Sequence, residues 1–102
     1  NTIFFDEIDN GLSGKSLLTT INLIKKIAFN QQILCITHHP LLASHSDVHY
    51  KVQKTLSDGL TSTTLKKLIT IKDKQNELAE LIGGGFTEAS NYALTLLNKA
   101  AA

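Results

Sequence analysis

The stretch IFFDEIDNGLSGKS, residues Ile3 to Ser16, decides the fold because an apolar run meets a group of polar and charged residues within it. The β-forming residues Ile3, Phe4 and Phe5 are followed at once by Asp6-Glu7. A short, continuous apolar run bounded by polar residues is typical of a fully buried strand in a parallel sheet. The stretch therefore predicts a buried strand that ends at Asp6, followed by a Gly/Asp/Asn-rich loop from Asp9 to Gly14.

The sequence after this loop predicts a helix and then a second strand. From Ser13 to Asn30, apolar residues recur at helical spacing, at positions 17, 21, 24 and 28. The segment Gln32 to Thr37, QILCIT, is another apolar run, and its Cys35 is interpreted as an inert core residue. A strand, a helix and a strand form a βαβ unit, so the two strands are expected to be parallel with a right-handed crossover.

The second half of the chain predicts a hairpin and two more helices. His38-His39-Pro40 ends the second strand, and Pro40 suits the first turn of a short helix. We therefore expect a short helix at 41–44. Residues 48–68 predict a β-hairpin that turns at Asp58-Gly59 and lies at the edge of the sheet. Two further helices are expected over 73–82 and 87–100, with one of the three glycines at 83–85 forming a left-handed cap between them.

Length and composition predict one small α/β domain covering residues 1–102. The chain has 42% hydrophobic and 19% charged residues and a net charge of +1, which gives no strong electrostatic case for direct binding to nucleic acid or membrane. The single cysteine excludes an internal disulfide and fits a reducing compartment, and no apolar run is long enough to span a membrane. Because the chain lacks Met and is inside an apolar run by its third residue, we interpret it as the C-terminal piece of a longer chain.

The opening loop admits three interpretations. Gly14-Lys15-Ser16 ends like a phosphate-binding P-loop, but that motif needs glycine at position 9, where this chain has Asp9. Leu12-Ser13-Gly14 resembles the start of an ATPase signature, yet Lys15 follows where a second glycine belongs. The third interpretation uses the acids: Asp6 at a strand end can hold Mg²⁺ through water, and the adjacent Glu7 can orient or deprotonate an attacking water.

Three segments together resemble the RecN family of bacterial DNA repair proteins. IFFDEIDNGLSG, residues 3–14, is similar to the family's Walker B and D-loop segment. QILCITHHPLLASHSD, residues 32–47, is similar to its switch-histidine segment, and ELAELIGGGFTEASNYALTLL, residues 77–97, to its C-terminal pattern. The resemblance runs from Ile3 to about Leu97.

This resemblance implies a partial P-loop NTPase head of the ABC/SMC type, belonging to a protein that acts in double-strand break repair and recombination. It implies ATP and Mg²⁺ as ligands, a second head that sandwiches ATP, DNA as a partner of the whole protein, and a place in the bacterial cytoplasm with the nucleoid. By the same resemblance, Asp6 is the magnesium partner, Glu7 the general base and His38 the switch histidine that senses the γ-phosphate. The D-loop, which contacts the opposing head, is assigned to residues Asp9, Asn10, Gly11 and Ser13.

The sequence also departs from the family pattern and leaves alternatives open. His39 stands where the family usually has Leu, and Leu41-Leu42 replace Gln-Val, which puts the packing of the short helix in doubt. The alternative functions are a non-catalytic head that only dimerises and a separate P-loop enzyme using Gly14-Lys15-Ser16. We interpret the lysines at 66, 67, 72 and 74 as a solvated face, and the histidines and Cys35 match no standard zinc spacing.

Overall fold

Two parallel strands and a connecting helix open the fold, as the apolar runs predict. The computed structural model describes residues 1–101. Strand β1 (Thr2–Asp6) pairs in parallel with β2 (Gln32–Ile36), with Phe5 beside Cys35 and Asp6 beside Ile36. Helix α1 (Gly14–Ile27) connects them. It is shorter than the expected 13–30, because residues 28–30 leave it through tighter turns closed by bonds from Phe29 N–H to the Lys26 carbonyl (3.3 Å) and from Asn30 N–H to the Ile27 carbonyl (3.2 Å).

The prediction that both strands are fully buried is wrong. Exposure alternates along β1, where Ile3 and Phe5 are half-buried while Phe4 is 58% exposed. On β2 only Ile33 is half-buried, and Leu34 and Ile36 are exposed. The reason is that continuous apolar runs are buried only when both faces of a sheet are covered. Within residues 1–101 this sheet has two strands, and the face that carries Phe4 and Leu34 stays open.

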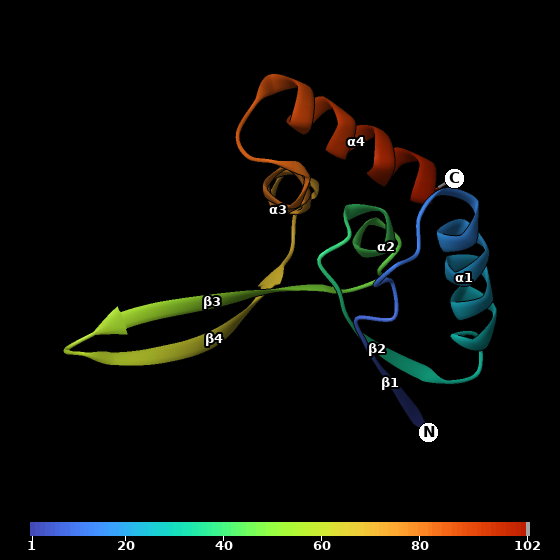
Figure 1. The fold of residues 1–102 in the computed structure, drawn as a ribbon, viewed down its shortest axis with the longest axis horizontal. Coiled ribbons are helices and arrows are strands. Elements are labelled where there is room, and N and C mark those ends of the chain that lie inside the picture. The colour runs from blue at the N-terminus through green and yellow to red at the C-terminus, as the bar shows by residue number, and fades with distance from the viewer. Residues whose placement is uncertain (102) are drawn as a thin grey trace.

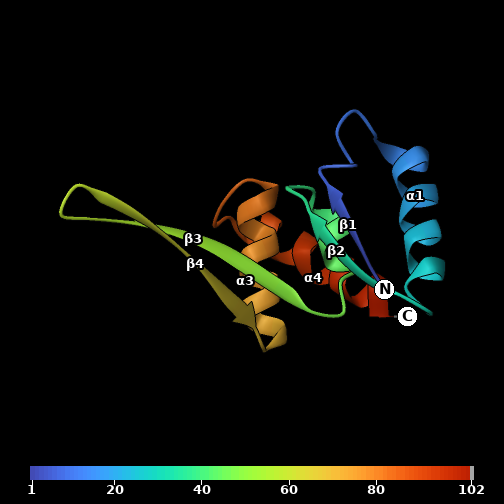
Figure 2. The ribbon, with the colours of Figure 1, turned by 90° about the horizontal axis from the view of Figure 1, so that it is seen from below.

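The β-hairpin is present but does not extend the parallel sheet. Strands β3 (His49–Ser57) and β4 (Leu60–Leu68) pair antiparallel, with Asp58-Gly59 at the turn as expected. They form a separate two-stranded sheet, so the prediction of a hairpin at the edge of the first sheet is wrong. Figures 1 and 2 both show the hairpin projecting away from the rest of the molecule. This projection contributes to extents of 44 × 36 × 28 Å and a radius of gyration of 14.5 Å, against about 13 Å for an ordinary domain of 100 residues.

Three further helices complete the chain. Helix α2 (Pro40–Ser44) starts with proline in its first turn, and α4 (Thr87–Ala101) matches the expected range closely. Helix α3 (Ile71–Ile82) begins two residues earlier than predicted, because the Thr70 hydroxyl accepts a hydrogen bond from the Asp73 N–H (3.0 Å) and caps the helix there. It ends at the glycines, where Gly84 has a positive φ of 116°. None of the helices in the described part of the chain is long and apolar enough to cross a membrane.

The buried core consists of two clusters that meet at α2. The first, the α1 cluster, contains Leu17, Ile21 and Leu42. The second, the α3–α4 cluster, contains Ala43 with residues of the last two helices: Leu78, Ala79, Ala89 and Ala93. Because Leu42 and Ala43 are neighbours on α2, this one-turn helix joins α1 to the α3–α4 pair, and Figure 1 shows it between them. The small alanines let α2, α3 and α4 approach closely around Leu78.

A polar contact also ties α3 to α4. The side-chain amide of Gln75 donates hydrogen bonds to the Ser90 carbonyl (2.9 Å) and to the Ser90 hydroxyl (2.8 Å). The contact is half-buried and therefore specifies how the two helices align, in addition to the apolar packing.

Leu78 is expected to be the side chain on which the stability of the C-terminal half depends most. It is completely buried between α2, α3 and α4, so Leu78→Ala removes its contacts and leaves a cavity, at a cost of about 2–5 kcal/mol. Urea unfolding followed by circular dichroism measures the loss. Leu94→Ala, which truncates a leucine that is 36% exposed on α4, is the matched control and should cost much less. Equal losses in the two variants would contradict this description of the core.

Candidate functional site

The site lies where the carboxyl ends of β1 and β2 meet. Asp6 ends β1 and is exposed on the open face of the sheet. The parallel ladder continues one residue further, because the Glu7 N–H donates to the Ile36 carbonyl (2.8 Å). Glu7 has a φ of 53°, an uncommon conformation for a residue with a side chain, and there the chain leaves the strand. Thr37 and His38 directly follow β2 and therefore stand at the same edge of the sheet.

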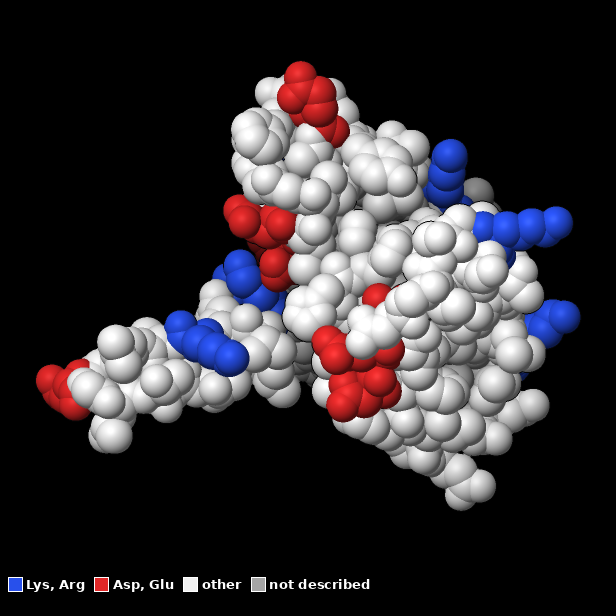
Figure 3. Space-filling model, viewed as in Figure 1, with Lys and Arg blue, Asp and Glu red and all other residues white. Residues whose placement is uncertain are grey.

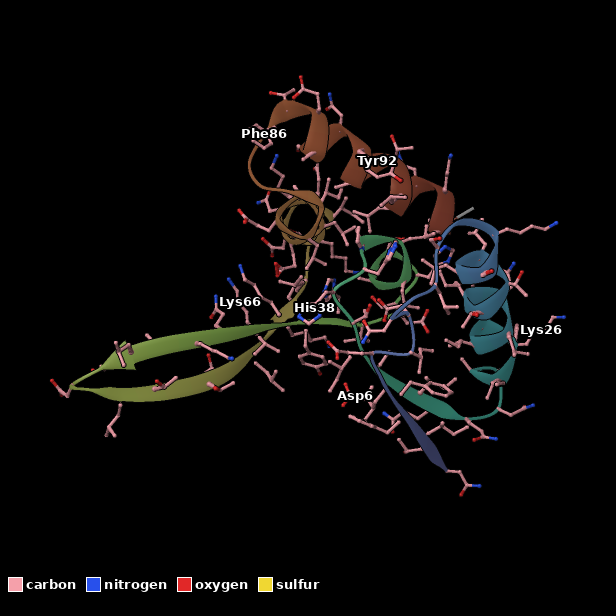
Figure 4. All side chains as sticks on the ribbon, viewed as in Figure 1. Asp6, Lys26, His38, Lys66, Phe86 and Tyr92 are labelled. Atoms are coloured by element: carbon pink, nitrogen blue, oxygen red, sulfur yellow. The ribbon has the colours of Figure 1, made fainter. Side chains whose placement is uncertain are left out.

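Glu7 and His38 are in direct contact. The Nδ1 atom of His38 lies 3.2 Å from Oε1 of Glu7, and the contact is an ion pair when the imidazole is protonated. The His38 side chain is 80% exposed and that of Glu7 is 41% exposed, so solvent screens the interaction and it adds little to stability. The sequence predicts that both residues stand at one edge of the sheet, but not that their side chains touch. Figure 4 shows His38 and Asp6 at this end of the sheet.

The loop after Glu7 is folded by two successive turns. The Asn10 N–H donates to the Glu7 carbonyl (3.1 Å), and the Leu12 N–H donates to the Asp9 carbonyl (3.0 Å). Leu12 packs against the α1 cluster and anchors the loop, while Gly11 takes a positive φ of 80°. The residues at 10, 11 and 13 are exposed. The loop is therefore held at both ends and presents its middle to solvent.

Asp9 differs from the rest of the loop because its carboxylate turns inward. Its Oδ1 atom is buried and has no hydrogen-bond partner within residues 1–101. The negative charge of Asp9 also acts on Cys35, whose thiol pKa is raised first by burial and then by this charge. Cys35 itself is exposed, so its assignment to the core is wrong. A raised pKa keeps the thiol protonated at neutral pH, which fits the expectation that it is inert.

His39 has a structural role that the sequence did not suggest. It is the N-cap of α2, and its Nδ1 atom accepts a hydrogen bond from the Leu41 N–H (3.2 Å). Its own N–H donates to the Thr37 hydroxyl (2.9 Å). Thr37 and His39 therefore fix the backbone on both sides of His38. The signal in the sequence was the position of His39 directly before Pro40, the first residue of the helix.

The residues Gly14, Lys15 and Ser16 form the first turn of α1, as expected. Gly14 has a φ of 53°, and the chain enters the helix through it. Lys15 and Ser16 are exposed, and their carbonyls accept hydrogen bonds from the hydroxyls of Thr19 and Thr20 (both 3.0 Å). Asp9 stands at the position where a P-loop has glycine, and one oxygen of its carboxylate is buried in the loop before this helix.

Comparison with known proteins finds relatives over most of the chain. The chain is similar to the DNA repair protein RecN of Synechocystis, with 37% identity over 99% of this chain and 20% of the relative. RecN of Bacillus subtilis is 39% identical over 81% of the chain and 14% of the relative, and RecN of Deinococcus radiodurans is 30% identical over 87% of the chain and 16% of the relative. The chain belongs to the RecN family. It spans about a fifth or less of the length of these relatives. No protein-family model matches it.

The membership in the RecN family bears on the departures noted in the sequence. The resemblance left the packing of α2 in doubt because His39 and Leu41-Leu42 differ from the family pattern. In the structure His39 caps the helix, Leu42 enters the α1 cluster and Leu41 packs against it from the half-buried margin. The fold therefore accommodates these departures from the family pattern. Through its packing, α2 also joins the RecN-like segments at residues 3–14 and 77–97.

A test of the cap follows from its geometry. His39→Leu, which restores the residue usual in RecN, removes the acceptor for the Leu41 N–H and is expected to cost about 0.5–2 kcal/mol. Thermal unfolding measures the loss. His39→Asn is the control, because asparagine is a favourable N-cap and should retain most of the stability. A His39→Leu variant as stable as the parent would show that the cap contributes nothing.

A second test concerns pH. Burial, followed by the charge of Lys25, lowers the pKa of His45, and burial with Lys74 lowers that of His49. Both imidazoles therefore bind protons less readily in the folded chain than in the unfolded chain, which binds them from about pH 6.5 downwards. Stability is therefore complete at pH 7.5 and is expected to fall as pH decreases through 6.5.

The melting temperature measured from pH 7.5 to pH 5.5 checks this expectation. The double variant His45→Gln/His49→Gln should flatten the profile, because it removes the two imidazoles whose pKa is lowered by burial. A parent profile without a slope between these pH values would contradict the lowered pKa of these two half-buried histidines.

Proposed function

We propose that this chain is the C-terminal part of the ATP-binding and ATP-hydrolysing head of a RecN protein, with a role in DNA double-strand break repair and recombination. The observation that carries the proposal is the contact of 3.2 Å between His38 and Glu7 at the adjoining ends of two parallel strands, with Asp6 beside them. Ligands bind to open α/β sheets at the carboxyl ends of the strands. The three residue types are those that phosphoryl transfer uses: a magnesium carboxylate, a base and a group that contacts phosphate.

The donor set fits magnesium. Mg²⁺ is usually held by one or two carboxylates, with waters and substrate phosphates as its other ligands. Asp6 is exposed at the strand end and has no ion pair with another residue in the described range, so its carboxylate is free for this role. With ATP, the ion would neutralise charge that develops on the β- and γ-phosphates.

The proposal gives separate roles to Glu7 and His38. In the proposed reaction the oxygen of water attacks the γ-phosphorus, ADP leaves, and Glu7 accepts the proton of that water. His38 senses the γ-phosphate. Because the imidazole reaches Glu7 directly, it also positions the carboxylate of the base. The partial P-loop NTPase fold of the ABC/SMC type belongs to this proposal, with the P-loop itself in another part of a RecN chain.

The loop from residue 9 to residue 13 is proposed to meet a second head. Asn10, Gly11 and Ser13 are exposed between two anchored ends, so they are the part of the D-loop that can reach a partner and its ATP. Asp9 acts differently, because one oxygen of its carboxylate is buried. We assign Asp9 to shaping the loop and the other three to the contact.

The experiment uses a full-length RecN polypeptide that carries these residues. Glu7→Gln keeps the shape of the side chain but removes the base, so ATP binding should persist while turnover falls by at least about 10²-fold, within the range of general base catalysis. Nucleotide binding is measured with a fluorescent ATP analogue, and turnover by phosphate release. Undiminished hydrolysis would overturn the assignment of Glu7.

Two further variants separate the alternatives. Lys15→Ala should have little effect, whereas loss of nucleotide binding in this variant would point to a P-loop enzyme that uses residues 14–16. Asp6→Ala should weaken nucleotide-dependent dimerisation of the heads. Dimerisation that is unchanged in both Asp6→Ala and Glu7→Gln would favour a non-catalytic dimerisation module.

A further inference from the structure

The imidazole of His38 is not held in place by packing. Its side chain is 80% exposed, and it meets Glu7 at 3.2 Å. Figure 3 shows acidic atoms gathered over this end of the β1–β2 sheet, and Asp6 directly precedes Glu7. An exposed side chain changes readily between rotamers. The direction in which the backbone presents His38 therefore decides whether its imidazole meets Glu7 or turns elsewhere.

A hydrogen bond from the backbone to a side chain fixes that direction. The Thr37 hydroxyl accepts a hydrogen bond from the His39 N–H (2.9 Å), two residues further on. The ring that this bond closes contains the whole backbone of His38, so both the φ and the ψ of His38 lie inside it. Threonine hydroxyls form turns of this kind by bonding to the backbone two residues on. The bond is half-buried, which shields it from competition with water.

The backbone of Glu7 is held independently of Thr37. Its N–H donates to the Ile36 carbonyl (2.8 Å), and its carbonyl accepts a hydrogen bond from the Asn10 N–H (3.1 Å). The first bond extends the strand ladder and the second closes a turn of the loop after β1, and neither uses the Thr37 hydroxyl. Loss of this hydroxyl should therefore release the orientation of His38 and leave the backbone of Glu7 in place.

We propose that Thr37 is a positioning residue for the reaction at the ends of β1 and β2, and that its hydroxyl sets the orientation in which His38 reaches Glu7 and the γ-phosphate. The inference rests on the proposed function, because it gives Thr37 a part in ATP hydrolysis. Thr37 acts through the backbone of His38 and does not need to touch ATP. A displacement of about 1 Å at a reacting group can cost about 10²-fold in rate, so one hydrogen bond at this place can control turnover.

The test uses a full-length RecN polypeptide that carries these residues. Thr37→Val keeps the shape of the side chain and removes the acceptor. The kcat for ATP hydrolysis should fall about ten-fold or more, while KM for ATP changes less than about three-fold, because the lost orientation matters in the transition state more than in binding. Thr37→Ser keeps the hydroxyl and should retain kcat to within about two-fold. Phosphate release over a range of ATP concentrations measures both constants.

Two controls separate positioning from a general loss of stability. Thr70→Val removes the same kind of bond at the start of α3, where the Thr70 hydroxyl accepts from the Asp73 N–H (3.0 Å), and should leave kcat unchanged at a temperature where the variants are folded. Thr37→Val added to His38→Ala should lower kcat less than about two-fold below that of His38→Ala alone, because Thr37 acts through His38. Melting curves followed by circular dichroism show that each variant is folded. If Thr37→Val does not fold, the comparison of Thr37→Ala with Thr37→Ser takes its place.

A second readout does not depend on ATP. In the parent chain, Glu7→Gln should shift the NMR signal of the His38 Cε1–H group, because the imidazole contacts the altered side chain. In the Thr37→Val background the same change of Glu7 should leave that signal nearly unmoved. An equal shift in both backgrounds would overturn the orienting role of Thr37.

The two readouts distinguish failure of this inference from failure of the proposed function. A Thr37→Val variant that hydrolyses ATP like the parent, or is impaired no more than Thr70→Val, would overturn the inference and leave the proposed function standing. An equally large effect of Thr37→Val with and without the His38 imidazole would also overturn it. Absence of ATP turnover in the parent, together with an NMR shift that depends on Thr37, would overturn the proposed function and support the orienting role of Thr37.

Discussion

The rest of the structure depends on the packing of α2, a helix of one turn. Its two consecutive residues Leu42 and Ala43 belong to different clusters, so α2 is the element through which α1 and the α3–α4 pair share a core. The helix follows directly after His38, and its cap is His39. The position of α2 therefore bears on the backbone that directly follows His38. The packing of the core and the backbone next to a candidate functional side chain thus involve the same short helix.

The geometry at the ends of β1 and β2 has a second cause, which lies in the backbone. A parallel ladder places the carboxyl ends of both strands at one edge. The bond from Glu7 N–H to the Ile36 carbonyl extends that ladder, and the left-handed conformation of Glu7 then ends it. Thr37 and His39 fix the backbone around His38 by hydrogen bonds of their own. The contact between Glu7 and His38 is weak in itself, since both side chains are exposed, but the backbone that brings them together is firmly held.

The hairpin and the open face of the β1–β2 sheet lie mostly exposed at the surface. The hairpin is attached through α3, where Leu68 is buried and Lys51 approaches Glu77, while most of its length is exposed. The open face of the β1–β2 sheet carries Phe4 and Leu34. Apolar and basic surfaces of this kind are where proteins meet partners. The chain therefore combines a small, alanine-rich core with exposed apolar and basic surfaces.

The sequence by itself determined the order and type of the elements, because periodicity and turn residues act locally. The apolar runs gave two parallel strands, Asp58-Gly59 gave the hairpin turn, and the helical spacing gave α1, α3 and α4 to within a few residues. The residues of the candidate site could also be named, since a strand end is marked in the sequence. Only the tertiary structure decided that both strands expose one face, that the hairpin forms its own sheet, that Asp9 turns inward and that His38 reaches Glu7. Each of these depends on which residues distant in the chain cover or approach a surface, and no local pattern in the sequence specifies that.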